Sequence, residues 1–128
     1  MSYFFTKVSN LTYEEVLVKV VEELKKEGFG VLTDIDIKET LKKKLDVNFR
    51  KYKILGACNP PFAYKALQAE EKIGLLLPCN VIVQENSKGE TEVSAINPLV
   101  SMQSVNNPTL ADVANEVKER LERVINNL

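Results

Sequence analysis

Cys58 and Cys79 are the side chains in this sequence best suited to chemistry, and they are its only two cysteines. Cys58 ends one predicted strand and Cys79 begins another, so antiparallel pairing of these strands would bring both thiols to one edge of a sheet. Two thiols at such an edge can form a disulfide, share a soft metal ion, or supply an attacking and a resolving thiol. Free cysteines also pack as small buried hydrophobes, and this structural role is the competing interpretation.

The residues after Cys58 predict the start of a helix. Asn59 is a preferred N-cap, and Pro60 suits the first helical position. The unpaired amides and the dipole of that helix start would stabilise a thiolate at Cys58 or bind an anionic ligand. Cys58, Asn59 and Cys79 are therefore the candidate ligand-binding residues. Met102 is a further candidate sulfur ligand for a soft metal such as copper(I), although its spacing does not require this role.

Composition excludes several common catalytic mechanisms. The 128 residues include no histidine, so neither a Ser-His-Asp nor a Cys-His pair can form. The chain has neither a glycine-rich phosphate loop nor a Gly-x-Ser-x-Gly turn. We assign no catalytic residue, and the sequence indicates no particular cofactor or metal.

A basic cluster offers a third kind of site. With 17 Lys and Arg against 18 Asp and Glu, the net charge of -1 provides no general attraction for nucleic acid, so we expect weak binding at most. Lys51 and Lys53 would share one face of a strand, which we expect to be a solvated sheet edge. The cluster comprises Lys42, Lys43, Lys44, Arg50, Lys51 and Lys53.

The hydrophobic pattern predicts five strands and four helices. Thr12 and Glu15 predict a capping box for a first helix that ends at Gly28, and Asp36 predicts the cap of a short helix. Residues 74–78 are interpreted as a buried apolar crossover, with a lid as the alternative. The predicted strands cover residues 3–8, 29–35, 52–58, 79–85 and 91–96, and the predicted helices cover residues 12–27, 36–45, 60–71 and 109–128.

These elements predict a single α+β domain over residues 1–128. Three strands cluster late in the chain, which indicates a mostly antiparallel sheet with the two long helices on one face. We find no signal peptide and no apolar run long enough to span a membrane. The expected location is the cytoplasm.

Four short motifs carry a resemblance to the domain of unknown function 302 family. The chain resembles the variety of this family with a cysteine before Asn-Pro and another after Leu-Pro. The resemblance implies a strand-helix-four-strands-helix fold similar to one half of the TATA-binding protein, with inserted short helices. It implies dimers in some members and no established reaction. The motifs are Gly28-Phe29, Gly56-Ala57-Cys58-Asn59-Pro60, Leu77-Pro78-Cys79 and Asn97-Pro98.

The leading hypothesis is a small soluble domain that binds a small ligand or a protein partner, as a homodimer, with no established reaction. One alternative is a thiol-redox or soft-metal protein that uses Cys58 and Cys79. Another is a weak nucleic-acid binder that uses the basic cluster between Lys42 and Lys53.

Overall fold

The computed structural model describes all residues from 1 to 128. The strands are β1 (Phe4–Ser9), β2 (Gly30–Asp36), β3 (Tyr52–Cys58), β4 (Cys79–Glu85) and β5 (Thr91–Ile96). The α-helices are α1 (Tyr13–Lys26), α2 (Ile37–Leu45), α3 (Pro60–Ala69), α4 (Pro98–Ser101) and α5 (Pro108–Asn126). Two short 3-10 helices are η1 (Ile73–Leu76) and η2 (Gln103–Val105).

The strands form one open sheet in the order β1-β5-β4-β3-β2, and every neighbouring pair is antiparallel. The predicted α+β class and antiparallel sheet are therefore confirmed. The likeness to half of the TATA-binding protein stays a prediction. None of the helices combines the length and the apolar composition that a membrane-spanning segment needs.

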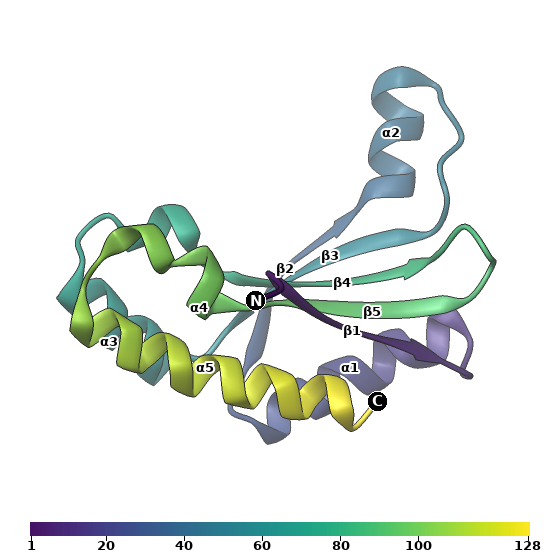
Figure 1. Ribbon diagram of the computed structural model, residues 1–128. Coiled ribbons are helices and arrows are strands. Elements are labelled where there is room, and N and C mark those ends of the chain that lie inside the picture. Colours follow the sequence, from purple (N-terminus) through teal and green to yellow (C-terminus); the bar gives the residue numbers. More distant parts are fainter.

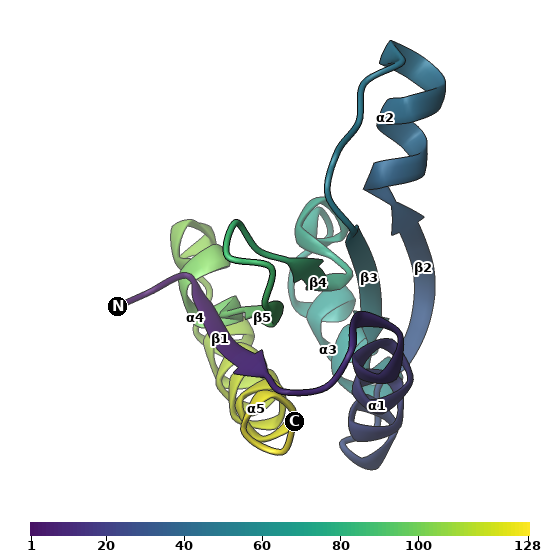
Figure 2. The same cartoon turned by 90° about the vertical axis from the view of Figure 1, so that its right-hand side faces the viewer.

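The long helices α1 and α5 lie on the same side of the sheet (Figures 1 and 2). Alternate side chains of the central strands point toward them, because successive strand residues face opposite sides. Val20 on α1, Val81 on β4 and Leu121 on α5 are completely inaccessible to solvent and join one core cluster. The other face of the sheet carries no helix against it.

The start of α1 follows the predicted capping box. Glu15 N donates a hydrogen bond to Thr12 Oγ1 over 3.1 Å, and Thr12 N donates to Glu15 Oε1 over 3.0 Å. After α1, Gly28 adopts the left-handed conformation at φ 87°, which glycine reaches without steric cost. This turn directs the chain into β2.

Helix α2 projects from the sheet as an arm, as Figure 1 shows. Asp36 caps it by accepting a hydrogen bond from Glu39 N over 3.0 Å, as predicted. None of its residues is buried. The arm therefore contributes no side chain to the core.

Two features of the region after α3 differ from the predictions. The helix ends at Ala69 rather than near Glu71, because Glu70 takes an extended conformation. The predicted buried crossover is wrong: Leu75 is 85% exposed, and only Ile73 of η1 is buried. A 3-10 turn this short presents only one side to the core, and Ile73 occupies it.

The predicted edge position of Lys51 and Lys53 is also wrong. Strand β3 lies inside the sheet between β2 and β4. Lys53 Nζ lies 3.3 Å from Asp34 Oδ2 on β2, and Lys51 Nζ lies 2.9 Å from Glu14 Oε1 on α1. Ion pairs with neighbouring elements, rather than an open edge, accommodate these two lysines.

Candidate functional site

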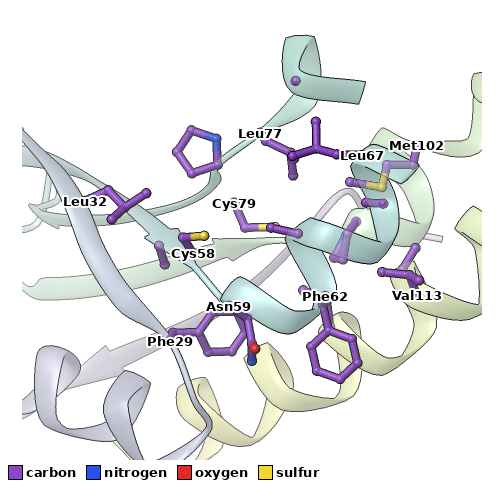
Figure 3. A pocket seen from close by; sticks show the side chains of 18 residues that line it. Phe29, Leu32, Cys58, Asn59, Phe62, Leu67, Leu77, Cys79, Met102 and Val113 are labelled. Atoms are coloured by element: carbon purple, nitrogen blue, oxygen red, sulfur yellow. The ribbon is translucent and has the colours of Figure 1, made fainter. Parts of the chain in front are cut away.

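The strands that carry the two cysteines are antiparallel neighbours. Ala57 on β3 pairs with Cys79 on β4, so Cys58 is one residue out of register with Cys79. Both thiols are free; Cys58 is partly exposed, and Cys79 is buried. Both side chains line the same cavity, as Figure 3 shows.

This cavity has a volume of about 310 Å³ and lies between the sheet, α3, α5 and the segment that leads into β4. Of its 18 lining residues, 14 are hydrophobic. Ala63 and Ala66 of α3 and Ala114 of α5 leave space that larger side chains would fill. The alanine-rich stripe of α3, visible in the sequence, thus borders an empty volume.

All four motifs that carry the family resemblance reach this cavity. Phe29 follows Gly28, and Pro98 follows Asn97; both Phe29 and Pro98 line the cavity. The other two motifs contribute Ala57, Cys58, Asn59, Leu77, Pro78 and Cys79. Segments from four parts of the chain therefore converge on one site.

Gly56 allows two of these motifs to pack together. A Cβ atom at Gly56 would lie 2.8 Å from Pro78 Cγ and would also collide with Thr33 Oγ1. No real Cβ tolerates such contacts without displacement of its neighbours. The absence of a side chain at Gly56 therefore lets Pro78 lie over β3 and form part of the cavity wall.

Asn59 occupies the predicted N-cap position, but its side chain does not cap α3. Pro60 and Pro61 have no N–H groups, so the first helical turn has few donors to offer. Asn59 Nδ2 instead donates a hydrogen bond to the Glu27 carbonyl over 3.0 Å. The predicted side-chain cap is wrong, and the two prolines also weaken the case for an anion site at this helix start.

Glu27 links three helices at one end of the cavity. Its carbonyl also accepts a hydrogen bond from Arg120 Nη1 over 3.1 Å, and its carboxylate accepts from Arg123 Nη2 over 2.9 Å. The Arg120 guanidinium carbon lies 5.2 Å from the ring centroid of Phe62, which lines the cavity. This polar cluster fixes α3 relative to α1 and α5.

The cavity walls carry no charged side chain. Burial, and then the nearby charge of Cys58, raise the pKa of Cys79 from 9.0 to about 11, so its thiol is neutral at ordinary pH. Asn59 supplies the amide among the lining groups. An uncharged ligand suits these surroundings better than an ionic one, because no wall group balances a buried charge.

No group of three or more histidine, cysteine or carboxylate side chains is placed to hold a metal ion. Met102 also lines the cavity, so sulfur atoms from Cys58, Cys79 and Met102 border the same space. These three are the residues available to a soft metal.

The basic cluster is largely committed to carboxylates. Besides Lys51 and Lys53, Lys42 Nζ lies 2.7 Å from Asp46 Oδ1, and Lys43 Nζ lies 2.8 Å from Glu39 Oε1. Arg50 lies over the ring of Phe49, with its guanidinium carbon 4.4 Å from the ring centroid. These contacts give no specific support to nucleic-acid binding.

Comparison with known families gives a match over nearly the whole chain. The family described as "Domain of unknown function DUF302" matches residues 5–128. The chain belongs to the DUF302 family. A crystal structure of an uncharacterized conserved DUF302 protein from Bacillus stearothermophilus is 28% identical, with a TM-score of 0.91. The alignment covers 98% of each chain, and no curated protein matches this DUF302 sequence significantly.

Sequence reasoning missed most of the apolar wall of this DUF302 domain. Phe29, Phe62 and Val113 line the cavity, but each has the spacing of an ordinary core residue. The alanines of α3 were the one sequence feature that could have indicated a cavity. Small side chains leave an empty volume where the neighbouring elements do not pack closely against them. The helical pattern alone does not distinguish a filled space from an empty one.

Proposed function

We propose that this DUF302 domain binds a small, neutral, apolar molecule in the cavity beside Cys58 and Cys79. The convergence of the four family-resemblance motifs on one apolar cavity is the observation that carries this proposal. Concave, mainly apolar pockets with a few polar groups are typical small-molecule sites. We assign no reaction to the domain.

The size of the cavity limits the ligand. An apolar cavity of about 150 Å³ holds one benzene molecule. The volume of about 310 Å³ therefore suits a ligand of about two rings, or an aliphatic molecule of similar bulk.

The available polar groups define how such a ligand would be oriented. One N–H of the Asn59 amide is used by the Glu27 carbonyl, which leaves the second N–H to donate and Oδ1 to accept a hydrogen bond from a ligand. The thiols of Cys58 and Cys79 are weak donors. An apolar ligand with at most one polar group fits this set.

The residues around the cavity support an apolar ligand. Leu32 and Leu67 line it and are 69% and 48% exposed. Leu75, next to the lining residue Gly74, is 85% exposed. An approaching apolar molecule would thus contact leucine side chains before it is fully enclosed.

Titration with prodan, a neutral two-ring naphthalene dye with environment-sensitive fluorescence, tests the proposal. Wild-type protein should bind the dye with a blue-shifted emission. Ala114→Leu should weaken binding by about tenfold or more, because the added side chain enters the cavity. Ala111→Leu makes the same change on the exposed side of α5 and should leave binding unchanged. Equal binding by both variants, or none by the wild type, would refute the proposed site.

We propose further that a second copy of the chain covers the open face of the sheet. Ile54 pairs with Ile82 on this face, and Ile35 and Phe4 on it are 45% and 38% exposed. The α2 arm carries Lys44, which is exposed and makes no ion pair within the chain, while the β4-β5 hairpin carries Glu85, Glu90 and Glu92. A twofold pairing lets the arm of one copy meet the hairpin of the other with opposite charge.

Native mass spectrometry tests the homodimer. The wild type should appear as two copies, and Ile82→Asp should dissociate them because it buries a charge at the centre of the interface. Val18→Asp, a matched change on the exposed side of α1, should remain dimeric. A monomeric wild type would contradict this part of the proposal.

The proposal places the domain in the cytoplasm, where reducing conditions keep cysteines as free thiols. The ligand site as proposed contains both cysteines in this form. Nucleic acid is not proposed as a partner, because four of the five lysines that predicted it pair with carboxylates of the same chain.

A further inference from the structure

The pairing of β3 with β4 brings Cys58 and Cys79 within disulfide range. Cys79 is opposite Ala57, and Cys58 is the next residue along β3. The spacing between opposite residues and the rise along a strand place the two Cα atoms about 6 Å apart. Cα separations of this size are typical of disulfides.

The two cysteine side chains also point into the same space, although a regular strand would not place them so. Successive residues of a regular strand face opposite sides, which would separate these thiols. Cys58 is the last residue of β3 and lies one residue beyond Ala57, where the regular pairing with β4 ends. Both cysteines nevertheless line one cavity, and Figure 3 shows both sulfur atoms turned into it.

We propose that Cys58 and Cys79 form a reversible disulfide that switches the cavity between a ligand-accepting reduced state and an oxidised state of lower affinity. Formation of the bond is independent of the proposed function. The effect of the bond on affinity rests on the proposed function.

Charge balance favours a disulfide over a soft metal ion shared by the two thiolates. Two thiolates around one copper(I) ion would leave a net negative charge, and no cationic side chain lines the cavity to balance it. A disulfide is neutral and apolar, and it matches the surrounding walls.

The oxidant we infer is a low-molecular-weight disulfide, RSSR. The partly exposed Cys58 loses its proton to solvent, and its sulfur attacks one sulfur of RSSR; the S–S bond breaks, and RS⁻ leaves and takes up a proton. Cys79 then loses its proton, and its sulfur attacks Cys58 Sγ and expels a second RS⁻, which is also protonated. Two protein thiols are oxidised to one disulfide while RSSR is reduced to two RSH.

Burial makes the second step the slower one. The pKa of Cys79 is raised to about 11, so only a small fraction of its thiol is ionised near neutral pH. The mixed disulfide on Cys58 should therefore accumulate first, and its conversion to the Cys58–Cys79 bridge should accelerate as the pH rises.

Oxidised glutathione, followed by denaturation, alkylation and intact-mass measurement, tests bond formation. The wild type should lose two hydrogens and retain no alkylatable thiol. Cys79→Ala should stop at one glutathione adduct, and Cys58→Ala should remain largely unmodified because Cys79 is buried. Retention of two alkylatable thiols, or of an adduct that never resolves in the wild type, would overturn the proposal.

Prodan binding to the reduced and oxidised wild type tests the switch. Oxidation should weaken binding by about fivefold or more, and reduction should restore it. A bridge that forms without changing the affinity would overturn the switch while leaving the ligand site intact. A bridge in a protein that binds no prodan in either state would contradict the proposed function and leave the disulfide itself established.

Discussion

Gly56 is the residue that lets the two cysteine-bearing segments meet. Its missing side chain makes room for Pro78, which immediately precedes Cys79, while Cys58 follows two residues after Gly56. A side chain here would push Pro78 or Thr33 away from β3. The geometry of the cavity therefore depends on a position that has no functional group of its own.

Gly56→Ala should lower the free energy of unfolding by about 1–3 kcal/mol, because an added methyl group overpacks this contact. Urea denaturation measures the change. Gly30→Ala is the matched control, since a Cβ there meets nothing within 4 Å, and it should change stability by less than about 0.5 kcal/mol. Equal effects of the two substitutions would contradict the packing we describe.

Cys79 should make the domain less stable in alkaline solution. Its pKa is raised from 9.0 to about 11, so the folded state keeps a proton that the unfolded chain loses. This contribution to stability is fully present below about pH 9 and is lost as the pH rises through 11. It amounts to about 2–3 kcal/mol.

Urea denaturation of wild type and Cys79→Ala from pH 8 to about 11 checks the sign. Burial, followed by the charges of Asp36 and Asp34, raises the pKa of Tyr13 to about 12, so both proteins should lose stability at the highest pH. The wild type should lose more between pH 9 and 11. Parallel curves would show that Cys79 is not the group responsible.

The α2 arm is an element that the remaining fold does not need. None of its residues is buried, and the core cluster has no member from it. Replacement of residues 39–50 by an Asn-Gly turn, which suits a two-residue hairpin between β2 and β3, should preserve the thermal unfolding temperature within a few degrees. Prodan binding should also persist, whereas native mass spectrometry should show loss of the dimer.

Loss of cooperative unfolding in this shortened protein would contradict the independence of the core from α2. Retention of the dimer would instead show that the arm does not hold the second copy. The two measurements therefore separate the role of α2 in folding from its role in association.

Elements with strong local signals were predicted well from the sequence. Thr12 and Glu15 specify a capping box through their own side chains, and the helix begins where they predict. The predicted cap at Asn59 was wrong because the side chain binds the Glu27 carbonyl instead, and this partner comes from a distant part of the chain. The predicted burial of Leu75 was wrong because the apolar character of a residue does not show which side of a short turn faces the core.

At the scale of the whole molecule, the sheet has one covered face and one open face (Figure 2). The covered face holds the core and, at one end, the cavity with both cysteines. The sequence left antiparallel pairing of the two cysteine strands as the condition under which the thiols would meet, and the register shows that pairing. The cavity was not predicted, because an empty volume depends on how α3 and α5 are spaced over the sheet.

Methyl NMR during addition of naphthalene is the most direct measurement of the central claim. Alanine methyl groups around the cavity serve as reporters at positions 57, 63, 66 and 114, while Ala95 and Ala111 lie outside it. A neutral apolar ligand should shift the four cavity signals in a saturable manner and leave Ala95 and Ala111 unchanged. Shifts at Ala111 without shifts at Ala66 and Ala114, or no saturable shift at all, would contradict a ligand site beside Cys58 and Cys79.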